Sequence, residues 1–171
     1  AAPPLCFSGH LDTVPLGDAE WSCDPFGGEI RDGRMMGRGT SDMKAGVAAF
    51  VCACINEADW LGDGPGVVLA LTSAEETGSQ GALEMVRYGQ PGKVSGLIVA
   101  EPTSNQVKVG HKGALWLRAQ VSGVTAHGST PHLGVNAISK AVDAIARVQS
   151  LTIGDGTVSA LGDPTLNVSR I

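Results

Sequence analysis

Short apolar segments alternate with longer periodic ones along the first hundred residues, and this alternation constrains the fold more than any other feature. Three short runs, 5–8, 66–72 and 96–100, have the composition of buried strands. Two segments between them, 43–58 and 80–88, have the apolar spacing of helices, the first buried on more than one side. We therefore predict an α/β fold, a mostly parallel sheet with helices on both faces. The run 66–72 is the expected central strand, covered on both faces.

The pattern changes after Pro102. Segments 107–109 and 114–121 are predicted to be antiparallel strands, 136–149 an amphipathic helix, and 166–171 the start of another strand. This order indicates a small α+β unit, so we predict two domains, 1–104 and 105–171. Within the first domain, the Asp32-Gly33 turn predicts a hairpin over 28–37.

Composition excludes several classes of protein. The formal net charge is -5, only 4% of residues are aromatic, and Lys and Arg form no cluster. Nucleic acid and anionic membrane surfaces are therefore poor partners. No run reaches the length of a membrane span, and no signal-peptide pattern is present, so we expect a cytoplasmic protein. The four cysteines form no C-x-x-C pair and are expected to be reduced and buried.

Polar residues with metal-binding chemistry follow the predicted strands. His10 stands just past the first strand, where α/β sheets place their ligands. Asp12 could accept a hydrogen bond from a neighbouring group or orient the His10 imidazole, leaving one ring nitrogen free for a metal. The simpler alternative is a loop histidine beside an Asx-turn.

A second cluster, 37–46, precedes the helix 43–58. Ser41 or Asp42 could cap that helix, and the glycines could simply form turns. Two glycines before a helix also occur in phosphate sites, but the spacing here matches neither common phosphate motif. An aspartate at this position favours a cation over a phosphate.

Two further acidic sites follow the other strands. Glu75 and Glu76 are adjacent, and two such carboxylates repel each other unless a cation or a proton lies between them. Capping of the next helix explains one of them but not both. Glu101 follows the strand 96–100. The sequence thus predicts five residues at one edge of one sheet: His10, Asp42, Glu75, Glu76 and Glu101.

The motifs GHLDTVP, GRGTSDMKAG, SAEETGS, AEPT, HKG and AHGSTPHLGVNAI occur in this order. In this the chain resembles the M20 metallopeptidase family, which includes acetylornithine deacetylase, succinyl-diaminopimelate desuccinylase, aminoacylase and glutamate carboxypeptidase. The AEPT, GHKG and GVNAI stretches are most similar to the deacetylase and desuccinylase branch of amino-acid biosynthesis. The resemblance implies a zinc-dependent hydrolase of the amide bond in N-acyl amino acids. A dipeptidase or carboxypeptidase of the same family is the alternative.

Site roles follow from the resemblance, position by position. Asp42 would bridge two zinc ions, which Co2+ or Mn2+ could replace. His10 and Glu101 would complete the protein ligands of one ion, and Glu76 would bind the other. Glu75 would be the general base that deprotonates the bridging water and later protonates the leaving amine. Asp12 would orient His10.

The resemblance also implies a role for the second domain. In family members the inserted domain forms a homodimer, and its histidine reaches the partner's active site to stabilise the tetrahedral intermediate. His127 matches that position, although a loop histidine in a Gly/Ser/Pro turn is the alternative. His111 and His132 are expected to be structural. The substrate would be a small N-acyl amino acid or peptide.

The family takes one more zinc-binding histidine from a segment beyond the inserted domain, and 105–171 offers no replacement. We therefore expect the chain to be a fragment, with a partial sheet that exposes apolar surface. Activity of the isolated chain is then doubtful. The alternative hypotheses are a non-catalytic relative or regulatory fragment that keeps the fold and, more distantly, a phosphate- or nucleotide-binding α/β protein.

Overall fold

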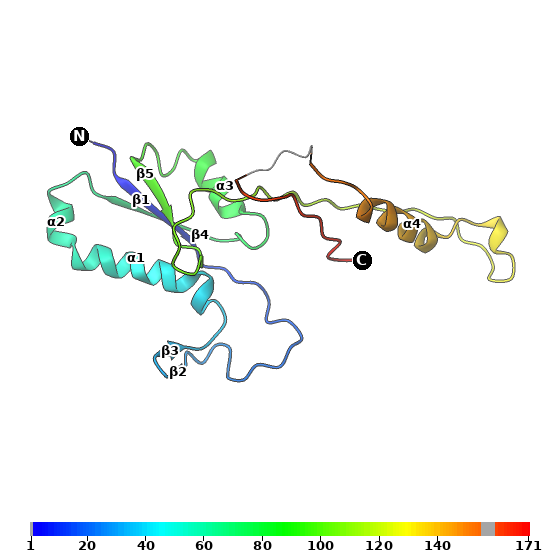
Figure 1. The fold of residues 1–171 in the computed structure, drawn as a ribbon, viewed down its shortest axis with the longest axis horizontal. Coiled ribbons are helices and arrows are strands. Elements are labelled where there is room, and N and C mark those ends of the chain that lie inside the picture. The colour runs from blue at the N-terminus through cyan, green and yellow to red at the C-terminus, as the bar shows by residue number, and fades with distance from the viewer. Residues whose placement is uncertain (1, 155–159) are drawn as a thin grey trace. The chain divides into compact units, whose positions relative to one another are not determined.

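A computed structural model describes residues 2–154 and 160–171 of the chain (Figure 1). The chain divides into two compact units, Ala1–Val107 and Lys108–Ile171. This division falls close to the boundary expected between domains 1–104 and 105–171. Residues 1 and 155–159 of those predicted domains lie outside the described residues.

Three parallel strands form the centre of the first unit. β1 (Leu5–His10) pairs along its whole length with β4 (Val67–Thr72), and its first four residues pair with β5 (Gly96–Val99). The strand order is β4-β1-β5, so β1 is central. The prediction that 66–72 is a covered central strand is wrong: Ala70 is buried, but Leu69 and Leu71 on the other face are exposed. An apolar run indicates that a strand is hydrophobic, but it does not indicate which strands lie beside it in the sheet.

Helices lie on both faces of this sheet, as predicted. α1 (Ala45–Asn56) and the short α2 (Ala58–Gly62) connect β1 to β4, and α3 (Gln80–Arg87) connects β4 back across the sheet to β5. The two crossovers run in opposite directions along the sheet. Because parallel crossovers are right-handed, their helices must cover opposite faces, and Figure 1 shows α1 and α3 on different sides of the strands.

One side of α1 packs on the sheet. The ring of Phe50 stacks on that of Phe7 with centroids 4.3 Å apart, and Val47 is buried. The outer side, with Ile55, is exposed, so the prediction of burial on more than one side is wrong. Nothing in the described part of the chain covers it. Exposed Leu97, Ile98 and Val99 on β5 confirm the expected apolar surface on the sheet.

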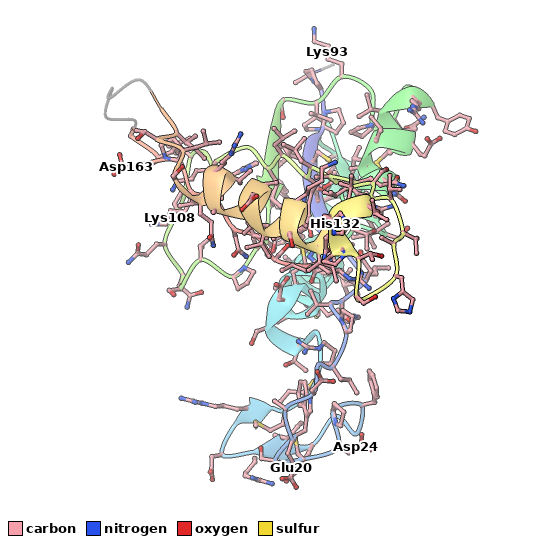
Figure 2. All side chains as sticks on the ribbon, turned by 90° about the vertical axis from the view of Figure 1, so that its right-hand side faces the viewer. Glu20, Asp24, Lys93, Lys108, His132 and Asp163 are labelled. Atoms are coloured by element: carbon pink, nitrogen blue, oxygen red, sulfur yellow. The ribbon has the colours of Figure 1, made fainter. Side chains whose placement is uncertain are left out.

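The predicted hairpin is confirmed. β2 (Ile30–Arg31) and β3 (Arg34–Met35) are antiparallel, and both turn residues have positive φ, 51° at Asp32 and 73° at Gly33. Such a turn matches the natural twist of a hairpin. Figure 2 shows Glu20 and Asp24 in the loop beside this hairpin and away from the strands of the main sheet.

The second unit contains one long helix, α4 (Ala137–Gln149), close to the predicted limits. Asn136 caps it, and its side-chain oxygen accepts hydrogen bonds from the N–H groups of Ile138 (2.9 Å) and Ser139 (3.2 Å). A single 3-10 turn, η2 (Pro131–Leu133), precedes the helix.

The strands predicted over 107–109, 114–121 and 166–171 do not form in the described structure. Its second unit has one isolated bridge, between Val124 and Val135, in place of a sheet. A strand forms only as part of a sheet, where a neighbouring strand satisfies its N–H and C=O groups, and apolar composition alone does not supply that strand.

All four cysteines are free, as expected. Cys6 is buried, Cys23 and Cys54 are partly buried, and Cys52 is exposed, so burial was wrongly predicted for Cys52. Among the helices that the structure describes, none has the combination of length and apolar composition that crossing a bilayer requires.

Candidate metal centre

The carboxyl ends of the three parallel strands bring the predicted residues to one edge of the sheet. His10 is the last residue of β1 and pairs with Thr72, the last residue of β4. The Leu11 N–H continues this pairing, donating to the Thr72 carbonyl at 3.0 Å. Residues just after each strand therefore meet at this edge, as the α/β architecture requires.

His10 is the buried centre of the cluster, with 2% of its surface exposed. Its Nδ1 lies 2.9 Å from the backbone carbonyl of Asp12. A carbonyl oxygen only accepts hydrogen bonds, so Nδ1 carries a proton. In the neutral imidazole, Nε2 then carries the lone pair.

Nε2 faces three carboxylates. It lies 3.2 Å from Asp42 Oδ1, 3.6 Å from Glu101 Oε1 and 3.8 Å from Glu75 Oε2. A lone pair and three carboxylates repel one another unless a proton or a metal ion lies among them. Burial lowers the pKa of His10, but the Asp12 carbonyl and the charges of Glu101, Glu75 and Asp12 outweigh it and raise that pKa.

Asp42 reaches the cluster from the turn η1 (Thr40–Lys44) ahead of α1. The next residue, Met43, is fully buried, and its sulfur accepts a hydrogen bond from the His10 backbone N–H at 3.1 Å. Gly9 permits this contact, because a Cβ there would lie 2.9 Å from the Met43 methyl carbon. Met43 thus anchors the turn beneath the end of β1 and leaves the Asp42 side chain half-exposed beside Nε2.

Asp12 holds the Glu75–Glu76 segment. Its two carboxylate oxygens each accept a backbone N–H at 3.2 Å, one from Glu75 and one from Glu76. Burial raises the pKa of Asp12, but these two N–H groups and the nearby His10 lower it below its usual value. The expected contact with His10 is made mainly by the Asp12 backbone, since the carboxylate lies 3.5 Å from Nδ1. The sequence did not predict that the carboxylate positions the two glutamates.

Glu101 completes the ring of acids. Burial raises its pKa; His10 opposes this shift, while Asp42, Glu75 and Glu76 add to it. Several carboxylates thus destabilise one another's charge around one histidine. A divalent cation would relieve this repulsion, and carboxylate oxygens and an imidazole nitrogen are common ligands of such ions.

Three donor atoms lie close enough to share one ion. His10, Asp42 and Glu76 each present a ligand atom within 4.8 Å of the other two. In residues 2–154 and 160–171, no other three such side chains converge in this way. The resemblance implied that His10, Asp42 and Glu101 bind one ion and that Glu76 binds the second. Both glutamates lie at the same sheet edge, and the structure brings Glu76 into the tightest group.

A family model for peptidase family M20/M25/M40 matches residues 6–163. The chain belongs to this family. Residues of the M20 motifs, separated by up to 91 positions in the sequence, thus lie around one imidazole in the structure.

Curated relatives agree with this M20 membership. The chain is 38% identical to succinyl-diaminopimelate desuccinylase 2 of Ruegeria sp. over 160 residues, 88% of this chain and 40% of that protein. It is 43% identical to a probable succinyl-diaminopimelate desuccinylase of Staphylococcus epidermidis over 145 residues, 83% of this chain and 36% of that protein. For the desuccinylase of Granulibacter bethesdensis the identity is 34% over 188 residues, 98% of this chain and 48% of that protein. The chain therefore spans less than half the length of these relatives.

The remaining predicted M20 residue, His127, belongs to the second unit. It lies in an exposed loop between the bridge residue Val124 and η2. Its Nδ1 lies 2.8 Å from the hydroxyl of Ser129. His111, whose Nδ1 faces the Lys112 carbonyl at 2.9 Å, and His132 on η2 are also exposed.

Proposed function

We propose that the complete gene product is a metal-dependent hydrolase that cleaves the amide bond of an N-acyl amino acid. The observation that carries this proposal is the His10 environment. Its Nε2 lone pair points at Asp42 with Glu101 and Glu75 close by, an arrangement suited to a divalent cation. Family membership supports the same chemistry.

By the same resemblance, His10, Asp42, Glu76 and Glu101 would hold the metal, which would be zinc. Co2+ or Mn2+ would be able to replace zinc. When bound, such ions polarise an amide carbonyl and acidify a water molecule. This chain's own residues would supply the rest. The protonated Nδ1 of His10 is fixed by Asp12, which keeps Nε2 aimed at the site.

Glu75 is the proposed general base. Its carboxylate lies 3.8 Å from His10 Nε2 and is partly exposed. The resemblance gives Glu75 no metal to bind, which leaves its carboxylate to accept a proton from the attacking water. The same carboxyl group would then return the proton to the leaving amine. Asp12 fixes the backbone of Glu75 and so limits where this carboxylate can point.

An acyl group that carries a carboxylate is the favoured substrate class. The relatives above are named for removing a succinyl group from succinyl-diaminopimelate. A cavity of about 850 Å³ adjoins the turn that carries Asp42, and Arg34, Arg38 and Lys44 are among its lining residues. None of the five residues of the metal cluster lines this cavity, so the preference for a carboxylate-bearing acyl group rests on the names of the relatives.

By the same resemblance, we propose a homodimer formed through the second domain. The side chain of His127 would stabilise the tetrahedral intermediate in the partner's site. A cytoplasmic location remains part of the proposal.

The test is Glu75→Gln in the complete gene product, assayed for amine release from N-succinyl-diaminopimelate, N-acetylornithine and simple dipeptides. We expect kcat to fall about 10²- to 10⁴-fold, because proton transfer is lost, while bound zinc, measured by elemental analysis, stays unchanged. Glu84→Gln on α3, an exposed partner of Arg87, is the matched control and should retain activity. Activity insensitive both to Glu75→Gln and to a chelator would refute the mechanism.

A further inference from the structure

The loop that carries His127 is closed at its base. Val124 and Val135 exchange two backbone hydrogen bonds, of 2.9 and 2.8 Å. Gly134 makes this closure possible, because a Cβ there would lie 2.6 Å from the Val124 carbonyl oxygen. Inside the loop, the N–H of Thr130 donates to the His127 carbonyl at 2.9 Å. The backbone around the histidine is therefore held by its own hydrogen bonds, although the side chain is exposed.

Ser129 makes two hydrogen bonds to one ring nitrogen of His127. Its backbone N–H donates to Nδ1 at 3.2 Å, and its hydroxyl oxygen lies 2.8 Å from the same atom. A backbone N–H can only donate, so Nδ1 must present a lone pair. The hydroxyl then also donates to Nδ1, and the ring proton of the neutral imidazole lies on Nε2.

We propose that Ser129 is a positioning residue that holds His127 in the tautomer protonated on Nε2. In this tautomer the free edge of the ring presents a hydrogen-bond donor and no metal-binding lone pair. The inference rests on the role proposed above for His127, since a donor is what a developing oxyanion needs.

His10 shows the opposite arrangement. Its Nδ1 donates to the Asp12 carbonyl, so its Nε2 carries a lone pair towards the carboxylates. The two histidines thus have opposite tautomers, each set by the group that contacts Nδ1. An acceptor at Nδ1 prepares His10 to bind a cation, and two donors at Nδ1 prepare His127 to bind an oxyanion.

Nitrogen-15 NMR of histidine-labelled complete gene product tests the tautomer directly. His127→Gln identifies the His127 signals by their loss. At alkaline pH, where imidazole is neutral, we expect a non-protonated Nδ1 and a protonated Nε2 for His127. A proton on Nδ1 of His127 would overturn the proposal.

The contribution of the hydroxyl is tested by Ser129→Ala, with Ser129→Thr as the conservative variant. The alanine variant loses one of the two bonds, so we expect kcat to fall about fivefold, the effect of one ordinary hydrogen bond, with KM unchanged. The His127 nitrogen signals should shift in Ser129→Ala and return towards the parent values in Ser129→Thr. The control Ser139→Ala, on α4, should change neither. If Ser129→Ala matches the parent in both spectrum and kcat, Ser129 is not a positioning residue.

Kinetics of His127→Gln separate this inference from the proposed function. Undiminished kcat in that variant would refute the catalytic role of His127. The NMR signals of the parent protein report the tautomer of His127 independently of that kinetic result.

Discussion

The backbone and the side chain of Asp12 accept hydrogen bonds from different partners. The carbonyl fixes His10, and the carboxylate accepts the N–H groups of Glu75 and Glu76. One residue therefore connects the end of β1, which supplies the proposed metal-binding nitrogen, to the loop after β4, which supplies the proposed base.

Substitution of Asp12 should affect catalysis more than metal binding. Asp12→Ala keeps the carbonyl that orients His10 but removes the acceptor for two N–H groups. We expect kcat to fall about 10- to 100-fold, as for loss of an outer-shell partner, with a smaller loss of zinc affinity. Steady-state kinetics and zinc titration measure the two effects. Asp12→Asn keeps one carbonyl acceptor and should retain more activity than Asp12→Ala. A larger loss of zinc affinity than of kcat would contradict this assignment.

The residue types of the site could be predicted from the sequence, but their contacts could not. His10, Asp42, Glu75, Glu76 and Glu101 were placed at one sheet edge because each follows a strand or opens a helix. The spacing of His10 and Asp12 does not say whether the Asp12 backbone or carboxylate faces the imidazole. The Ser129 contact with His127 was likewise missed. A serine two residues from a histidine is common, and only loop geometry shows that it contacts Nδ1.

At the scale of elements, close packing at glycines holds the strand ends and helices together. A Cβ at Gly46, near the start of α1, would lie 2.4 Å from both the Cβ and the carbonyl oxygen of Ala100. Ala100 directly precedes Glu101. The packing of α1 on the end of β5 therefore sets the distance between the Asp42 turn and Glu101.

Gly46→Ala should destabilise the protein. The added methyl group forces α1 away from Ala100, and overpacking of this kind costs about 1–3 kcal/mol of unfolding free energy. Chemical denaturation measures this loss. Gly62→Ala, at a glycine where a Cβ would meet nothing within 4 Å, is the matched control and should be neutral or slightly stabilising. Equal stability of the two variants would show that the Gly46 contact relaxes without cost.

Element prediction succeeded where the sequence carries local signals. The Asp32-Gly33 turn and the periodicity of 80–88 and 136–149 both depend on neighbouring residues. The order of the strands depends on long-range pairing, and β1 proved central in place of β4. The strands expected over 107–121 failed for a related reason. Their composition suits a sheet, but a sheet also requires a partner strand.

For the whole molecule, charge repulsion at the sheet edge links metal binding to stability. The carboxylates around His10 raise the pKa of Glu101 together with its burial, so the metal-free site carries an electrostatic cost. We expect zinc to raise the melting temperature of the complete gene product and a chelator to lower it reversibly. At a free metal concentration 100 times Kd, the gain is about 2.7 kcal/mol. Differential scanning calorimetry measures the shift.

Two variants separate this effect from general stabilisation by zinc. His10→Ala removes the imidazole that Asp42 and Glu101 face, so zinc should raise its melting temperature less than that of the parent. His111→Ala, at an exposed position of the second unit, should respond to zinc as the parent does. A zinc response in His10→Ala as large as in the parent would show that His10 does not bind the metal.

The position of β1 in the sheet has a consequence for synthesis on the ribosome. β1 leaves the exit tunnel before either of the strands that flank it, and β5 follows it by about ninety residues of translation. Its imidazole therefore emerges long before Glu101 does. The nascent chain cannot assemble the full ring of acids until β5 has docked, so completion of the ring belongs to a late stage of folding, after the sheet has closed around its first strand.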